Sequence, residues 1–181
     1  AGVGAAVDTQ LLEANTQAYI ADNVSINRAG NITVSADSYE KITSVAVMAA
    51  GGQYFAGAAV ANAHEIDVDT IAYIGNDTVA DDAKTTLENV GDVTVTAQDD
   101  VDLTANAGGA SVNISGSGGA SGTLGAAVEV LDKNVKASVG KVNINGNSLK
   151  VKAENTGDLI TTANGIAVAA ALYGGGVTGS A

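Results

Sequence analysis

A short string, Gly-Ala-Ala-Val, occurs three times in this chain, starting at Gly4, Gly57 and Gly125. Each copy is followed, in the same order, by two further shared elements. The first is Ala-Tyr-Ile or a close variant, and the second is a segment that alternates apolar and polar residues and ends in Ala. Three elements in one order, repeated three times, indicate an internal repeat of the size found in solenoids.

The two later elements can be placed residue by residue. Ala-Tyr-Ile begins at Ala18 and Ala72 and becomes Ala-Ser-Val at Ala137. The alternating segments are Asn-Ile-Thr-Val-Ser-Ala from Asn31, Asp-Val-Thr-Val-Thr-Ala from Asp92 and Ser-Leu-Lys-Val-Lys-Ala from Ser148. Repeat units are therefore expected at approximately 4–56, 57–124 and 125–181, all in a single repeat array over 1–181. We expect this array to be a piece of a longer chain.

The middle unit is longer than its neighbours. Its extra residues fall in two stretches, the polar 76–89 and the Gly/Ser-rich 108–124. Insertions in such stretches are typical of surface loops, so both are expected to be loops. The only segment with a helix-like composition is 80–88, inside the first insertion.

Alternation of apolar and polar residues predicts an all-β protein. A repeat of short strands and Gly corners buries its apolar face when successive turns stack, which predicts a parallel β-helix, or β-solenoid, of about three repeats. Frequent inward Ala and Gly would let opposite walls approach closely. With about 20 to 27 residues per turn, and turns about 4.8 Å apart, the piece would be a rod of roughly 35 to 45 Å. Two or three turns per unit both fit the sequence.

Three other β architectures are weaker alternatives. A β-sandwich has no reason to repeat three elements in order. An outer-membrane barrel needs aromatic girdles, and the chain has five Tyr and one Phe. A cross-β fibre is opposed by the net charge of −12, because like charges in register repel.

Composition removes most common kinds of functional site. The chain of 181 residues has no Pro, no Cys and no Trp, which excludes a disulfide scaffold, a cysteine zinc site, a thiol nucleophile and a proline-rich linker. Its acidity argues against nucleic acid and against anionic membrane surfaces, because both require clustered Lys and Arg. No stretch approaches the roughly 18 apolar residues of a membrane helix, so membrane insertion is not expected.

The repeat resembles that of a known family. Its Gly-Ala-Ala-Val, its Ala-Tyr-Ile, the Gly-Asp-Val-Thr-Val-Thr-Ala from Gly91 and the Ala/Gly-rich 105–109 are similar to repeats of very large Gram-negative exoproteins, the filamentous-haemagglutinin-like and leukotoxin-like adhesins. The resemblance covers essentially the whole chain. It implies a β-helical filament, exported through an outer-membrane transporter by a two-partner or related type V route. It also implies an extracellular or cell-surface location and attachment to an unidentified host or bacterial receptor or glycan.

Individual residues give little sign of chemistry. His64 is the only imidazole, it lies in a strand-like run, and no Gly-x-Ser-x-Gly nucleophile motif accompanies it. No phosphate-binding Gly-x-x-x-x-Gly-Lys occurs either. We therefore nominate no catalytic residue and no cofactor, and expect the chain not to be an enzyme.

Some weaker candidates stay open. Acidic groups could offer oxygens to Ca²⁺, although they do not match the nonapeptide of calcium-loaded β-rolls, and we nominate no metal ligand. These groups are Asp67/Asp69, Asp81/Asp82 and, as the best placed, Asp99/Asp100/Asp102. Glycosylation is a side hypothesis at four sequons, at Asn23, Asn31, Asn76 and Asn113. Tyr19 and Tyr73 hold matching places and are expected to stack on one another.

Three functions follow as hypotheses. The first is a structural stalk or filament segment of an adhesin that presents surface and loops for attachment. The second is a ligand- or glycan-binding module that works through the insertions 76–89 and 108–124. The third, a β-helical polysaccharide-active enzyme, is disfavoured because the chain has few basic and aromatic residues for a sugar-binding groove. Open edge strands also predict end-to-end self-association.

Overall fold

The computed structural model describes residues 1–75, 84–171 and 176–180, and every regular element in them is a β-strand. The first turn contains β1 (Gly2–Ile20), β2 (Ser25–Asn27) and β3 (Ile32–Gly52). The second contains β4 (Phe55–Ile74), β5 (Thr85–Glu88) and β6 (Asp92–Ser115). The third contains β7 (Gly119–Val139), β8 (Val142–Asn145), β9 (Ser148–Thr156) and β10 (Leu159–Ala171), and β11 (Gly176–Ser180) begins a fourth.

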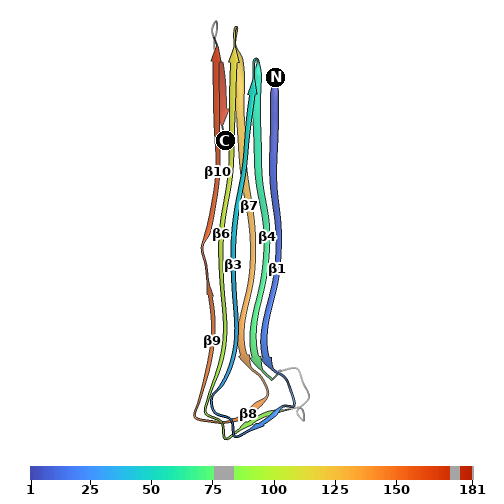
Figure 1. Cartoon of the computed structure of the whole chain (residues 1–181), viewed down its shortest axis with the longest axis vertical. Helices are drawn as coiled ribbons and strands as arrows, with labels where there is room; N and C mark the ends of the chain where they lie inside the picture. The colour runs from blue at the N-terminus through green and yellow to red at the C-terminus, as the bar shows by residue number, and fades with distance from the viewer. Residues whose placement is uncertain (76–83, 172–175, 181) are drawn as a thin grey trace.

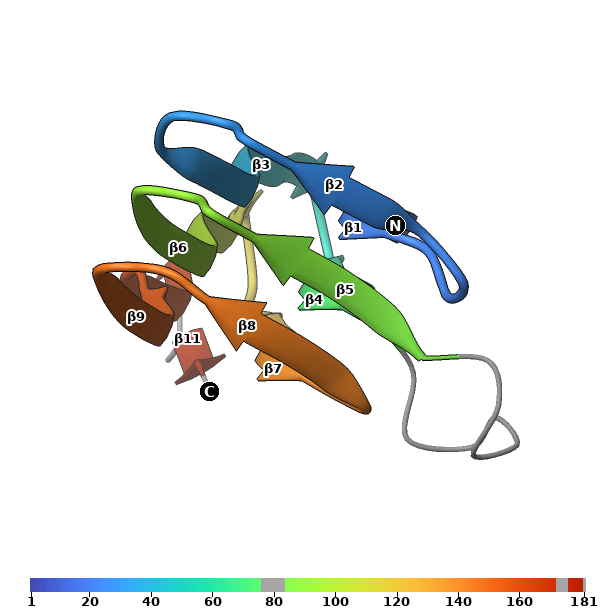
Figure 2. The same cartoon turned by 90° about the horizontal axis from the view of Figure 1, so that it is seen from below.

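Equivalent strands of successive turns pair in parallel and form three sheets. The long sheets follow the orders β1-β4-β7-β11 and β3-β6, with both β9 and β10 paired to β6, and the narrow sheet follows β2-β5-β8. Figure 2 shows the three turns stacked on one another, with the narrow sheet closing one side. The predicted parallel β-helix of about three repeats is confirmed.

The predicted length of a turn was wrong. Ile32 pairs with Val93, and Val93 pairs with Leu149, so successive turns are offset by 61 and 56 residues and each repeat forms one turn. The error came from expecting short strands. Along its strands the molecule is long, because a 20-residue strand spans about 66 Å. Along the stacking direction it is short, because the first and third turns are only about 10 Å apart. The fragment is therefore a flat slab whose long axis follows its strands, not a rod of stacked short turns (Figure 1).

Two of the three repeated elements are in register. Ala18 pairs with Ala72 and Ala72 with Ala137, and the alternating segments pair in the same residue-for-residue way. Gly-Ala-Ala-Val is not in register. Gly4 pairs with Ala58, so the second copy lies one residue out of line with the first. Gly57 pairs with Gly122, so the third copy lies three residues out of line with the second. Small side chains fit any neighbouring row, and the unit borders expected at these glycines fall inside the long strands.

The insertions differ from the expected loops. The described end of the first, Thr85–Glu88, is strand β5, so the helical alternative is wrong there, while residues 76–83 lie outside the described residues. Leu87 explains this strand, because it is fully buried in a row between Ile26 and Ile144. The second insertion is mostly strand as well. Its residues extend β6 and β7, and only 116–118 connect them.

The core changes in character along the slab. Beside the narrow sheet it contains large side chains, including Ile74 and Leu87, because three walls enclose a wide interior. Toward the β6–β7 connection only two walls face each other, and the interior consists mainly of small residues. A Cβ added to Gly109 would lie 2.5 Å from the Thr123 Cγ2 atom. The expected close approach of opposite walls is thus confirmed at this end, which we call the tip.

Candidate functional site

His64 lies inside the slab with an acidic side chain on either side. It is 3% exposed and projects inward from β4. Its Nδ1 atom is 2.6 Å from Glu129 Oε2, and its Nε2 atom is 3.5 Å from Asp8 Oδ2. The three residues come from β4, β7 and β1, and the cluster thus joins all three turns of one sheet.

The Asp8 end of this cluster reaches the opposite sheet. The Ser44 hydroxyl, on β3, donates a hydrogen bond to Asp8 Oδ2. This bond is the main reason that the pKa of Asp8 is lowered; desolvation opposes the shift, and the hydrogen bond and charge of His64 assist it. Because both ring nitrogens of His64 face carboxylates, and Ser44 bonds to Asp8, no hydroxyl within this cluster is placed for activation by the imidazole.

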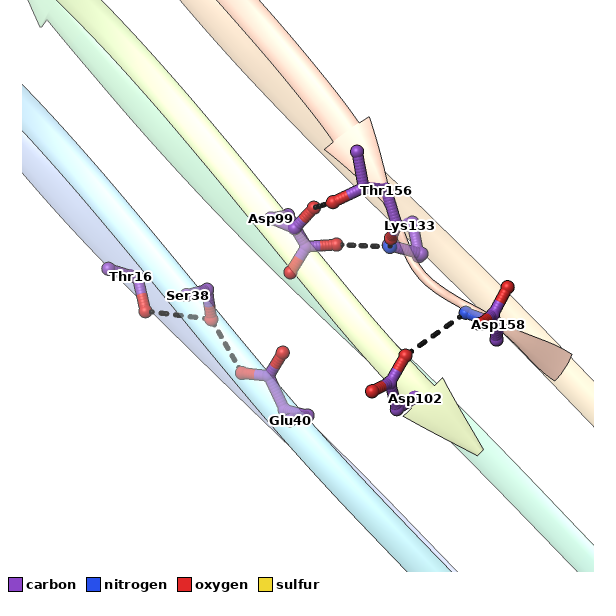
Figure 3. Close-up of polar contacts among 8 residues, drawn as sticks. All are labelled: Thr16, Ser38, Glu40, Asp99, Asp102, Lys133, Thr156 and Asp158. Carbon is purple, nitrogen blue, oxygen red and sulfur yellow. Dashed lines mark hydrogen bonds and ion pairs between the residues drawn. The ribbon is translucent and has the colours of Figure 1, made fainter. Parts of the chain in front are cut away.

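A second buried cluster surrounds Lys133 and Asp99. Lys133 Nζ lies 2.6 Å from Asp99 Oδ2, and their side chains are 8% and 0% exposed. Lys133 also donates to the Thr156 carbonyl oxygen at 2.7 Å. Glu40 lies beside Asp99 and accepts a hydrogen bond from Ser38 Oγ at 2.5 Å. Figure 3 shows these residues on neighbouring strands of the stack.

The acidic groups considered as weak calcium candidates do not converge. Asp99 points into the core and pairs with Lys133, whereas strand alternation places Asp100 and Asp102 on the outer face of β6. Asp67 is likewise exposed on the outer face of β4, and Asp81 with Asp82 lies outside the described residues. Within the described ranges, no group of three or more His, Cys, Asp or Glu side chains is arranged to hold a metal ion.

A third polar cluster occupies the interior near the tip. Ser111 Oγ lies 3.0 Å from Thr123 Oγ1 and 3.3 Å from Ser121 Oγ. Ser121 and Thr123 also donate to carbonyl oxygens of β10. These hydroxyls take the place of an apolar core. Asn113 is fully buried beside them, so the sequon at this position is not accessible to a glycosyltransferase in the folded chain.

The outer faces of both long sheets are apolar toward the tip. On β1-β4-β7 this region comprises the outward residues among 3–11, 57–65 and 122–130, with Glu65 at its border. Its most exposed large apolar side chains are Val3 at 76% and Leu11 at 75%. The outer face of β3-β6-β10 is similar, and its exposed apolar residues are Val45, Val47, Val112, Ile114, Ile166 and Val168.

Each apolar region contains a shallow groove. One has a volume of about 390 Å³ and lies over Val47, Gly108 and Ile166. The other, of about 430 Å³, lies over Leu11 and Val128 on the opposite sheet. The same faces become charged nearer the narrow sheet, where the exposed acids of β1, β4 and β7 are Glu13, Asp67 and Asp132.

The expected stacking of two outward tyrosines is confirmed. The rings of Tyr19 and Tyr73 stack with centroids 5.1 Å apart and an angle of 7° between their planes. Thr33, Thr94 and Lys150 form one row, so a lysine interrupts the threonines and no flat threonine array results at this place.

Comparison of the chain with family models, with curated proteins and with solved structures gave no match. The described part of the chain contains no helix capable of crossing a membrane. The buried clusters around His64 and Lys133 were missed by the sequence analysis. For the His64 cluster the signal lay in the register of Ala-Tyr-Ile, since His64 and Glu129 each stand eight residues before that element.

Proposed function

We propose that this chain is a structural segment of an extracellular bacterial adhesin filament, without catalytic chemistry, that sets reach and presents surface for attachment. The observation that supports it is the stacking of one repeat per turn in parallel register, from β1 through β4 and β7 to β11. Added turns extend such a stack without changing its cross-section.

The ends of the stack support this function. In the described residues β1, β2 and β3 each pair on one side only, and so do β8, β9 and β10 at the other end. Unpaired strand edges are templates for further parallel strands. Interior rows that are half-buried in the end turns, such as Leu12 above Ile66, gain cover when another turn is added.

The surfaces available for attachment are the outer faces of the two long sheets. Each long sheet presents an apolar region toward the tip and a charged region toward the narrow sheet, and every further turn would widen both. Recognition through inserted loops has less support. The second insertion is mostly strand, and most of the first lies outside the described residues.

Tandem copies of the chain test the stalk function. Three added turns at about 4.8 Å should raise the height of the stack by about 14 Å while its roughly 66 Å width stays constant. Small-angle X-ray scattering of one, two and three copies measures both dimensions. Growth along the strand direction, as for beads on a string, would contradict a continuous stack.

A glycan array with the single chain separates the stalk from a ligand-binding module. We expect no selective glycan binding, and a variant lacking residues 76–83 should give the same signal. Selective binding that disappears in this variant would favour the binding module.

Light scattering of the single chain at increasing concentration should show end-to-end association through the open edges, and a strictly monomeric protein at millimolar concentration would count against it.

A further inference from the structure

The contact between Lys133 and Asp99 joins different sheets and different turns. Lys133 projects inward from β7 in the third turn, and Asp99 projects inward from β6 in the second. The Nζ to Oδ2 distance of 2.6 Å brings the amine near the roughly 3–3.5 Å from Cγ at which a nucleophile is placed for attack. The backbone of both strands is fixed by parallel pairing, so this approach is imposed by the fold.

The contact is almost without solvent. The two side chains are 8% and 0% exposed. Among the described residues no group donates a hydrogen bond to either Asp99 carboxylate oxygen, although Oδ2 lies 2.6 Å from the Lys133 amine. Lys133 lies in a row below the fully buried Val68, and Val101 follows Asp99 on the same inner face. A buried ion pair loses much hydration energy, and an uncharged product at the same place avoids this loss.

Glu40 supplies a third reacting group. It lies on β3 in the first turn, one row from Asp99. Burial is the main reason that the pKa of Glu40 is raised. The hydrogen bond from Ser38 opposes the shift, the neighbouring Asp99 carboxyl adds to it, and the charge of Lys133 opposes it. The Glu40 Oε2 atom is buried and has no hydrogen-bond partner among the described residues. A partly buried carboxyl beside the reacting pair is suited to carry protons between them.

We propose that Lys133 and Asp99 condense into an intramolecular amide, an isopeptide bond, with Glu40 transferring the protons. A proton first passes from Nζ to a carboxylate, which converts the ion pair into an amine and a carboxylic acid. The Nζ lone pair then attacks Asp99 Cγ and forms the new C–N bond. Glu40 takes a proton from Nζ and returns one to the departing hydroxyl, the C–O bond breaks, and water leaves. The ammonium and the carboxylate thus give one amide and one water, without an oxidant or cofactor.

The bond would tie the second turn to the third across the interior. It would close a loop of chain from Asp99 to Lys133, which includes the end of β6, the connection at the tip and most of β7. The chain has no Cys, so no disulfide can do this. Turns that carry tension along a filament would then be held by a covalent link as well as by hydrogen bonds.

Intact mass spectrometry of the full chain under denaturing conditions tests the proposal. We expect a mass lower than that of the sequence by one water, and fragmentation should place the link between Lys133 and Asp99. Lys133→Met should keep the full sequence mass. Glu40→Gln should form the bond about 10²–10⁴-fold more slowly, because a general acid–base group contributes about that factor.

The chain contains its own control for proximity. Lys152 Nζ and Glu154 Oε2 are 2.5 Å apart, but their side chains are 51% and 40% exposed and no third carboxyl accompanies them among the described contacts. This pair should stay unlinked. Folded wild-type chain with the full sequence mass would overturn the proposal, and so would a link at Lys152. Far-UV circular dichroism establishes folding, so the wild-type mass decides the question even where a variant does not fold.

Discussion

Leu87 tests whether the narrow sheet closes the interior. It lies on β5, is fully buried, and forms a row with Ile26 above and Ile144 below. Its inner neighbours include Ile74 and Val93 in the same core cluster. We consider Leu87→Ala, which removes three carbon atoms from a site without solvent.

The expected loss can be estimated from the surroundings. Replacing a buried Leu by Ala destabilises proteins by about 2–5 kcal/mol, and the loss is larger where the walls cannot collapse into the space. Here β5 is hydrogen-bonded to strands on both sides, so its backbone cannot move inward without breaking these pairs. We therefore expect a loss of about 3–4 kcal/mol in the free energy of unfolding. For a chain of this size the midpoint would fall by about 6–16 °C.

Urea unfolding monitored by circular dichroism measures this change. The matched control is Leu124→Ala, since Leu124 is 62% exposed on the outer face of β7. That variant should change the stability by no more than about 0.5 kcal/mol. Equal effects of the two substitutions, or a loss below about 1 kcal/mol for Leu87→Ala, would show that β5 does not enclose a packed interior.

Three further predictions concern single residues. Glu129→Leu should lower the stability by about 1–3 kcal/mol in thermal unfolding, because His64 loses a buried hydrogen-bond partner, while Glu129→Gln should lose less; equal losses would contradict this role. The pKa of Asp8 is lowered in the folded state, so its contribution to stability is present above its usual pKa and disappears as the pH falls through the lowered value. In Asp8→Asn the melting temperature should therefore fall less steeply with decreasing pH in the acid range. The same steepness as in the wild type would refute this. Gly157 has φ +130° and a Cβ there would lie 2.1 Å from a β6 carbonyl oxygen, so Gly157→Ala should lose at least about 1–3 kcal/mol in urea unfolding, whereas Gly116→Ala, with open space around it, should be tolerated.

The sequence predicted the rows that run along the stack. The Ala-Tyr-Ile and alternating elements were aligned as the strands pair, which placed Tyr19 over Tyr73 and Thr33 over Thr94. These predictions succeeded because parallel, in-register pairing puts equivalent residues of each repeat side by side. Gly-Ala-Ala-Val misled for the opposite reason. Its small residues fit several neighbouring rows, so its place in the sequence does not fix its place in the sheet.

The buried partners of His64 illustrate the consequence. Counting from Gly-Ala-Ala-Val puts His64 in line with Leu11, whereas counting back from Ala-Tyr-Ile puts it in line with Gln10 and Glu129. The structure has the second alignment. The His64–Glu129 pair was thus within reach of the sequence, given the right element to align.

The chain's alternation and repeats by themselves determined a parallel stack of equivalent strands and the side chains that face inward. This is because each strand pairs with the equivalent strand of the next repeat, so the pattern within one repeat is enough to predict each row. Only the tertiary structure decided the length of a turn and the residues that meet across the interior. Lys133 and Asp99 belong to different sheets, and their contact depends on where the chain bends and how closely two walls pack. Both are set by the volumes of many side chains together, which no single repeated motif encodes.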